Sequence, residues 1–217
     1  MNEAAENETR HRSRRAAPSE RRTRALDAFI DLVLEHGTHP RPEEVAERAD
    51  VSIASLYRYF TDLDELRNDA VARLAERYPD LFVIADIGTG PRDERIASFA
   101  RARLALHETL YPLELLGRAT GLHDDCAQRH VESARAAMAN QINRHFDVEL
   151  QTLSTARRDD TVATIAALTS VETWQQFRHS YGRTATQTRR AWSTAIAALL
   201  PTVDQSTSTA RQRRRRR

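Results

Sequence analysis

The stretch EVAERADVSIASLYRYFTDLDEL, residues 44–66, decides the fold. It begins as a short helix and reaches Asp50, a residue type that accepts a left-handed turn more readily than most. Two residues later comes Ser52, a favoured N-cap, which predicts a second short helix over 53–59. Two short helices joined by a tight turn are the layout of a helix-turn-helix motif, placed here at 41–60.

The segments on both sides of the motif are predicted to be helices as well. Apolar residues at i, i+3, i+4 and i+7 indicate a helix over about 19–36. Pro42 suits the first position of the next helix, at 43–49. A longer helix is expected over 63–78, with inward residues Leu66, Ala70, Val71 and Leu74.

The second helix of the motif suits the major groove of DNA, which is about 12 Å wide and admits one helix. Ile53, Ala54 and Ser55 are small enough to approach base edges. Leu56 and Phe60, at i and i+4, are expected to point inward. For the ring of Phe60 we therefore predict ordinary helix packing.

Hydroxyl and guanidinium groups on this helix match DNA phosphates, which position a protein on the duplex without reading its sequence. Ser52, Ser55, Tyr57 and Tyr59 offer hydroxyls, and Arg58 is the best candidate for a guanine or a phosphate. The predicted DNA-binding residues are Arg41, Ser52, Ile53, Ala54, Ser55, Tyr57, Arg58 and Tyr59.

Residues 44–66, with the supporting helix at 22–36, resemble the TetR family of transcriptional regulators. The matching residues are Val45-Ala46, Val51-Ser52, Leu56-Tyr57, Phe60 and Leu66. The resemblance is specific over about residues 20–70 and only architectural beyond them. It implies an all-α fold of about nine helices. An N-terminal three-helix helix-turn-helix DNA-binding domain would occupy 19–78, and a C-terminal helical effector-binding and dimerisation domain 79–200.

The sequence departs from the family pattern in two places. Asp50 stands where the family has a turn glycine. Leu63, flanked by acidic residues within 62–65, stands where members often have lysine, so a phosphate contact from that helix is not expected. The motif at 41–60 carries three Arg against three Glu and one Asp, a net charge of −1. Charge on the motif alone would not hold DNA.

Basic charge is concentrated at the two ends of the chain. The net charge is +2, of which residues 1–24 contribute +3 (seven Arg, four Glu) and residues 201–217 contribute +5 (six Arg, one Asp). The remaining residues, 25–200, therefore carry −6. A basic arm at 1–18 and an Arg-rich tail at 201–217 are predicted to be disordered.

One hypothesis is that the N-terminal arm supplies the phosphate or minor-groove contacts that the acidic motif lacks. The arginines involved would be Arg10, Arg12, Arg14, Arg15, Arg21, Arg22 and Arg24. The alternative is a solvated arm without a role. The Arg-rich tail has the same two interpretations, a disordered end or a source of non-specific attraction to nucleic acid.

Composition favours helices and a reducing compartment. Apolar residues make up 40% of the 217, and only six residues are glycine. Cys126 is the single cysteine, so no disulfide forms within the chain and a cytoplasmic location is expected. The N-terminus lacks the apolar run of a secretory signal. The uncharged run at 191–203 is shorter than the roughly 20 residues that span a bilayer, so no membrane association is expected and no cofactor is indicated.

Four helical stretches are predicted in the second half, after turn residues at 88–91. They cover about 92–110, 124–152, 159–179 and 185–200, with a shorter piece at 112–120. Asp124 and Asp125 are candidates to cap the long central stretch. No segment alternates with period two, so no sheet is expected.

Polar residues in this half raise two possibilities, a metal site and an effector pocket. Cys126 and His130 lie at i and i+4 on one helical face, but no fourth ligand is apparent nearby, so no metal site is predicted. Small residues beside Met138 leave either a cavity or plain helix packing. The family resemblance implies a pocket for a small-molecule effector, which the sequence does not identify. The predicted effector-binding residues are Arg103, His107, Tyr111, His130, Met138 and Gln141.

The last two predicted helices carry wide apolar stripes. One face of each is expected in the core, and the remaining apolar and alanine surface suits a two-fold four-helix bundle. The resemblance likewise implies a homodimer, whose heads would reach successive major grooves of a palindromic operator about 34–36 Å apart. The predicted dimerisation residues are Trp174, Phe177, Trp192, Ala195, Ile196 and Leu199.

These features predict a sequence-specific DNA-binding transcriptional regulator, a repressor released from its operator by a small-molecule effector. The alternative is a helical nucleic-acid-binding or interaction protein with the same fold and no specific operator, which the acidic motif favours. An enzyme is not predicted, because the sequence has no recognisable nucleophile–base spacing, phosphate-cradling Gly-rich loop or paired carboxylates.

Overall fold

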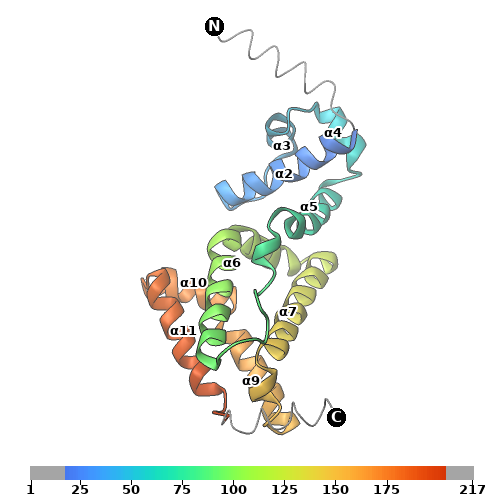
Figure 1. The fold of residues 1–217 in the computed structure, drawn as a ribbon. Helices are drawn as coiled ribbons and strands as arrows, with labels where there is room; N and C mark the ends of the chain where they lie inside the picture. Colours follow the sequence, from blue (N-terminus) through green and yellow to red (C-terminus); the bar gives the residue numbers. More distant parts are fainter. Residues whose placement is uncertain (1–17, 204–217) are drawn as a thin grey trace, which may run out of the picture. The chain divides into compact units, whose positions relative to one another are not determined.

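The computed structural model describes residues 18–203, and these form an all-α fold (Figure 1). Ten α-helices, one 3-10 turn and one π-helical turn make up the regular structure of these residues, with no strand among them. The prediction of an all-α fold is confirmed.

The described residues divide into two compact units. The first unit holds residues up to 82 together with 110–131. The second unit holds residues 83–109 and those from 132 onward. The predicted head at 19–78 lies within the first unit, which also takes in a segment of the second half of the sequence.

The head of the first unit consists of four helices. They are α2 (Pro18–His36), α3 (Pro42–Arg48), α4 (Ile53–Tyr59) and α5 (Leu63–Arg77). The other three helices all pack against α2 (Figure 1). The predicted apolar stripe of α2 is confirmed, since its residues are no more than 5% exposed: Leu26, Phe29, Ile30 and Val33.

Ion pairs tie α5 to α2. The guanidinium of Arg73 donates to both carboxylate oxygens of Asp27, at 3.1 and 3.2 Å. Arg77 donates to Asp31 at 2.5 Å, and Arg22 of α2 pairs with Asp69 of α5. Because these bidentate and repeated pairs are partly buried, they stabilise the α2–α5 packing on which the smaller helices rest.

The ends of the head helices follow local rules. Gly37, with a φ of +69°, donates its N–H to Val33 O at 2.8 Å and ends α2. Pro42 occupies the first turn of α3, as predicted. In α5, Leu66, Ala70 and Leu74 are buried as predicted, but Val71 is 39% exposed, so its assignment to the inward face was wrong.

After a 3-10 turn, η1 (Pro79–Leu81), the chain enters α6 (Arg92–Gly121), which runs unbroken through Pro112. The sequence predicted a break there, because proline has no N–H to donate to the carbonyl four residues earlier. Leu106 and Leu110, before the proline, are buried, and Leu113 and Leu116, after it, are half-buried, so the inward face continues past Pro112. Packing of that face outweighs the loss of one backbone hydrogen bond.

The remaining helices are shorter than predicted. They are α7 (Asp125–His145), α8 (Asp147–Leu150), α9 (Thr155–Leu168), α10 (Val171–Gln175), the π-helical turn η2 (Gln176–Ser180) and α11 (Ala185–Leu199). The single helix predicted over 124–152 is interrupted at Phe146. The one predicted over 159–179 ends at Leu168, and Ser170 caps a new helix by accepting the N–H of Thr173.

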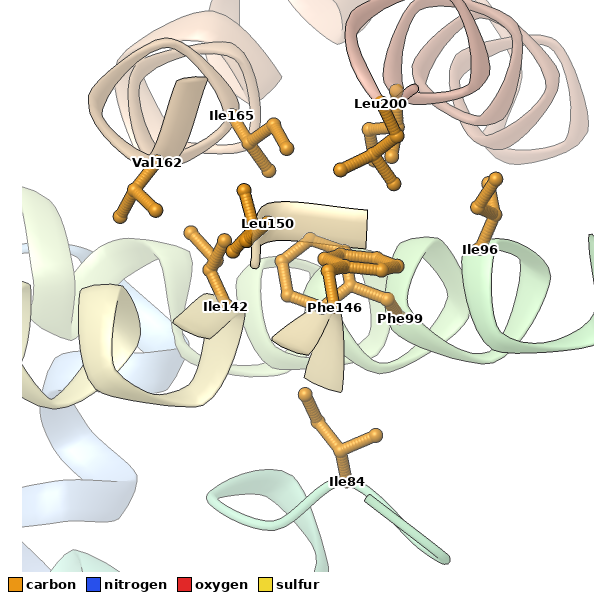
Figure 2. Close-up of a cluster of buried hydrophobic side chains, with 10 residues drawn as sticks. Ile84, Ile96, Phe99, Ile142, Phe146, Leu150, Val162, Ile165 and Leu200 are labelled. Atoms are coloured by element: carbon orange, nitrogen blue, oxygen red, sulfur yellow. The ribbon is translucent and has the colours of Figure 1, made fainter. Parts of the chain in front are cut away.

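The core of the second unit is an apolar cluster from five helices and the segment before α6 (Figure 2). Phe99 and Phe146 meet edge-to-face with their centroids 5.3 Å apart. Ile142, Ile165 and Ile196 are fully buried around them. This packing brings α6, α7, α9 and α11 together around one interior.

A charged pair is buried beside that cluster. Arg95 and Glu149 are 5% and 1% exposed, and the guanidinium and carboxylate make two contacts, one of them 3.0 Å long. Arg95 also donates to His145 O at 2.7 Å. His145 lies between backbone groups: Gly88 donates its N–H to Nδ1 at 3.1 Å, and Nε2 lies 2.8 Å from Arg95 O.

Within residues 18–203, no helix combines the length and the apolar character that crossing a bilayer requires.

Candidate nucleic-acid interface

The turn between α3 and α4 has helix-turn-helix geometry. Asp50 adopts a φ of 53°, in the left-handed region that residues other than glycine seldom occupy. Its N–H donates to Glu47 O at 3.1 Å, and the N–H of Val51 donates to Ala46 O at 3.0 Å. Asp50 is therefore the turn residue, as predicted.

One face of α4 is anchored in the head. Leu56 and Phe60 are each 2% exposed, which confirms their predicted inward positions. The guanidinium carbon of Arg22 lies 4.9 Å from the centre of the Phe60 ring and covers it. This anchoring determines which side of the short helix faces outward.

The opposite face of α4 is open. Tyr57 is 52% exposed and Ile53 is 38% exposed, while Ala54 and Arg58 are also exposed. An exposed isoleucine on a helix with two small neighbours leaves a narrow leading face. A helix with such a face suits the major groove, which admits one α-helix.

Ser52 begins α4 by capping it. Its Oγ accepts the N–H of Ser55 at 3.1 Å and also donates to Ser55 Oγ at 2.9 Å. The predicted N-cap is confirmed. Ser52 is exposed and Ser55 is half-buried, and the hydroxyl proton of Ser55 remains for a base or a phosphate.

Arg58, Tyr59 and Arg21 form a polar group at the end of α4. Arg58 donates to the Tyr59 hydroxyl at 3.3 Å and reaches Ser55 Oγ at 3.5 Å. Hydrogen bonding from Arg58, followed by that from Arg21 of α2, holds the pKa of the Tyr59 hydroxyl below its ordinary value. A hydroxyl between two guanidinium groups forms a site suited to binding an oxyanion such as a phosphate.

Arg41 lies at the N-cap of α3 and is exposed. Its backbone N–H donates to Glu44 at 2.7 Å, and its guanidinium donates to the same carboxylate at 3.1 Å. The N–H of Arg41 is the main reason that the pKa of Glu44 is lowered. Exposed ion pairs of this kind are weak, so Arg41 is free to exchange Glu44 for a phosphate.

The acidic residues at the start of α5 have structural roles. Asp62 caps the helix by accepting the N–H of Glu65 at 2.8 Å. Glu65 in turn accepts the N–H of Thr61, the residue before the cap, at 2.6 Å, and Asp64 pairs with Arg67. The family's lysine position is held by Leu63, which is 40% exposed.

The first unit also joins its head to the segment 110–131. Arg67 of α5 donates to Asp124, whose other carboxylate oxygen accepts the N–H groups of Cys126 and Ala127 at 2.7 and 3.2 Å. Asp124 is thus the cap of α7, one of the two predicted candidates. His39 Nε2 lies 3.1 Å from Thr120 Oγ1.

Most of the predicted N-terminal basic arm, with its arginines at 10, 12, 14 and 15, lies outside the described residues. The Arg-rich tail from 204 onward lies outside them as well. Three of the arginines assigned to the arm lie within α2. Arg22 pairs with Asp69 and covers the Phe60 ring, and Arg21 hydrogen-bonds to Tyr59.

Three predicted effector-binding residues come together in the second unit. Arg103 is 4% exposed and donates to Gln141 Oε1 at 2.8 Å and to Met138 O at 3.4 Å. Its guanidinium carbon also lies 5.0 Å from the centre of the Phe99 ring. His107, one turn along α6, is 0% exposed and contacts Trp174 and Trp192.

Tyr111 and His130, the other two predicted effector-binding residues, belong to the first unit and are half-buried. Cys126, at i−4 from His130, is half-buried too. Across residues 18–203, no three or more His, Cys, Asp or Glu side chains gather as a metal ion would need.

Three of the predicted dimerisation residues are inside the chain. Trp174, Trp192 and Ile196 are 5%, 0% and 0% exposed, so they belong to the core of the second unit and cannot form an outer surface. The sequence pattern could not separate a stripe covered by the same chain from one left outside. Phe177 and Ala195 are half-buried, and Leu199 is 37% exposed.

One residue of interest was missed in the sequence: Thr188, which is fully buried on α11, one turn before Trp192. Tyr181, beside η2, is 67% exposed. The signal for Thr188 was its i−4 spacing from Trp192. As a polar residue it interrupted the apolar stripe, so it was not counted with it.

This geometry defines the class of protein: an all-helical protein with a helix-turn-helix head. No protein-family model matches the chain. A curated relative, the HTH-type transcriptional repressor KstR from Rhodococcus jostii (strain RHA1), is 45% identical over 62 residues. The match covers 28% of this chain and 29% of KstR, so the chain aligns with less than a third of that relative.

Solved structures match over most of the chain. A TetR-family transcriptional regulator from Streptomyces coelicolor superposes with a TM-score of 0.70 at 22% identity, over 83% of this chain and 80% of that one. The multidrug binding protein EbrR, complexed with imidazole, gives a TM-score of 0.53 at 18% identity, over 86% and 98%. The chain has the fold of the TetR-family transcriptional regulators.

Proposed function

We propose that the chain is a sequence-specific DNA-binding transcriptional regulator, a repressor that a small-molecule effector releases from its operator. The observation that carries the proposal is the outward face of α4, a short helix anchored by Leu56 and Phe60 with small side chains and Arg58 on its open side. Similarity to a TetR-family fold and, locally, to the repressor KstR supports it.

The residues of α4 would divide the work of recognition. Ile53, Ala54 and Ser55 lie on the leading face, where apolar groups contact thymine methyls and a hydroxyl contacts base edges. Tyr57 and the Arg58–Tyr59 pair would bind phosphates on the groove walls. Ser52, at the start of α4, and Arg41, at the start of α3, would add contacts to the DNA phosphates.

A homodimer is part of the proposal. Since the two tryptophans and Ile196 are internal, the contact would use the exposed parts of η2 and α11, with Tyr181 and Leu199 as its apolar centre. Phe177 and Ala195, both half-buried, lie beside them. Two heads would then read half-sites about 34–36 Å apart on a palindrome.

Release by an effector is the third part of the proposal. EbrR is named a multidrug binding protein, and its resemblance to this chain supports a ligand-responsive role. Such a regulator acts in the cytoplasm, as the single cysteine led us to expect. The fold belongs to a family of regulators without catalytic activity, and no reaction is proposed.

Selection of bound genomic fragments, with and without a metabolite extract, tests the proposal. We expect one discrete palindromic footprint that the extract abolishes. Ala54→Glu places a charge on the leading face and should remove the footprint. The matched control Ala72→Glu, on an exposed position of α5, should keep it.

Two other results would count against the proposal. Salt-sensitive binding without sequence preference would favour the alternative, a nucleic-acid-binding protein with no specific operator. Absence of binding to any fragment would contradict both interpretations.

The dimer is tested by light scattering after gel filtration. Leu199→Arg should convert a dimer to a monomer. The control Leu122→Arg changes a leucine that is 78% exposed in the first unit and should leave the mass unchanged. A wild-type protein that is monomeric at micromolar concentration would refute this part.

A further inference from the structure

Two buried polar atoms lie on one face of α11. Thr188 and Trp192 are one turn apart, and both side chains are 0% exposed. Thr188 Oγ1 and Trp192 Nε1 make no hydrogen bond within residues 18–203. Buried polar atoms in folded proteins are nearly always hydrogen-bonded, to the protein or to ordered water. These two atoms therefore have unused hydrogen-bonding capacity that a bound molecule could match.

Aromatic rings adjoin this face. The Trp192 ring meets His107 of α6 edge-on, with centroids 6.3 Å apart and an interplanar angle of 89°. His107 also contacts Trp174 of α10, at 6.5 Å and 48°. Thr169 O, 2.9 Å from His107 Nε2, fixes the orientation of the imidazole. We call His107, Trp174, Thr188 and Trp192 the His107 cluster.

A π-helical turn lies next to the cluster. The turn η2 follows directly after α10, which carries Trp174. Its exposed His179 packs edge-on against Trp174, with centroids 5.5 Å apart. Trp174 is thus the layer between buried His107 and the surface. Because π-helical turns are uncommon and concentrate at functional sites, a shift of η2 is the natural route of access.

The chemistry of the two atoms defines the guest. The indole N–H of Trp192 only donates, and the Thr188 hydroxyl donates or accepts, so the guest must carry an acceptor. Both side chains are neutral, and an ion would lose its hydration among aromatic rings without gaining a charged partner from them. The flat rings of the cluster favour a flat molecule.

We propose that the His107 cluster binds a small, flat, neutral molecule with a hydrogen-bond acceptor, which takes the Trp192 N–H and the Thr188 O–H. The inference rests on the ligand-responsive regulator proposed above and names the chemical class of its effector. An aromatic ketone is the simplest molecule of this class.

The test uses the emission of the only two tryptophans of the chain, Trp174 and Trp192, both of which belong to the cluster. Full-length protein without DNA is titrated with acetophenone, with ethylbenzene as a matched probe that lacks the acceptor, and with benzoate as a charged one. We expect a saturable change with acetophenone. Ethylbenzene and benzoate should bind at least about tenfold more weakly, since each leaves a buried group unmatched.

Variants of one residue identify the site. Thr188→Val keeps the side-chain shape and removes the hydroxyl, so acetophenone should bind about tenfold more weakly while ethylbenzene is unaffected. Thr188→Ser retains the hydroxyl and should keep the preference for acetophenone. The control Thr194→Val, at an exposed position of the same helix, should change neither affinity.

Three results would overturn the inference: no saturable change with acetophenone up to its solubility, equal affinity for acetophenone and ethylbenzene, or a preference that Thr188→Val leaves intact. The titration contains no DNA and the fragment selection contains none of these probes. Failure of the cluster as a binding site is therefore distinguishable from failure of the proposed DNA-binding function.

Discussion

Arg58 donates to the hydroxyl of Tyr59 at 3.3 Å, and its guanidinium carbon lies 5.3 Å from the centre of the same ring. The arginine is therefore held along the surface of α4 before any DNA is bound. A side chain ordered in advance loses less conformational entropy when it binds, so this pair is a preorganised phosphate contact.

Removing that contact should weaken DNA binding without changing sequence preference. Tyr59→Phe is expected to lower affinity by about three- to tenfold on every sequence tested, the effect of one hydrogen bond. Arg58→Ala should reduce the slope of log affinity against log salt by about one. Fluorescence anisotropy at several salt concentrations measures both, and Arg129→Ala, on an exposed position of α7, is the matched control.

The left-handed turn at Asp50 makes a prediction about stability. With a φ of 53°, a β-branched residue is strained there, so Asp50→Val should lower the free energy of unfolding by about 1–2 kcal/mol. Asp50→Gly should cost far less, because glycine adopts this conformation without strain. Urea unfolding compares the two. A valine variant as stable as the glycine variant would contradict the turn geometry.

The buried pair of Arg95 and Glu149 should be sensitive to the loss of one partner. Glu149→Ala leaves a guanidinium that is 5% exposed without its carboxylate, and we expect a loss of about 3–5 kcal/mol. Glu172→Ala removes a carboxylate that pairs with Arg135 at 3.6 Å on the surface, and should have little effect. Denaturant unfolding of the two variants, side by side, checks this contrast.

His145 should make stability depend on pH. Burial lowers its pKa below the ordinary value, opposed by the hydrogen bond with Arg95 O, with Glu149 and Arg103 acting at longer range. With the proton on Nε2, Nδ1 accepts the N–H of Gly88, and protonation of Nδ1 would break this bond.

The sign of the effect follows from this lowered pKa. The unfolded chain takes up the proton near pH 6.5, before the folded protein does, so the stabilisation is complete above that pH and is lost as the pH falls toward the folded pKa. Thermal unfolding from pH 7 to pH 5 should show this decline, and His145→Gln should flatten it. His123→Gln, on an exposed residue, should retain the wild-type decline.

Local rules predicted the head well. The turn at Asp50, the cap at Ser52 and the inward pair Leu56 and Phe60 each depend on a few neighbouring residues, and the structure has all of them. Capping and short-range spacing are encoded within one or two turns of helix, so no knowledge of distant contacts was needed.

Rules of the same kind failed where distant packing decides. Pro112 predicts a helix end, yet α6 continues, with its inward face buried before the proline and half-buried after it. The stripes with Trp174 and Trp192 correctly indicated burial, but a stripe does not say whether the same chain or a second copy covers it. The contacts with His107 supply that information, and no spacing in the sequence contains it.

Asp124 uses its two carboxylate oxygens for different helices, one for the first amides of α7 and one for Arg67 of α5. Fraying of the first turn of α7 and release of α5 are therefore linked events. Deuterium uptake at the amides of Cys126 and Ala127 consequently reports on the contact between Asp124 and Arg67, which is more than fifty residues away in the sequence. Removing that contact with Arg67→Gln should accelerate the uptake.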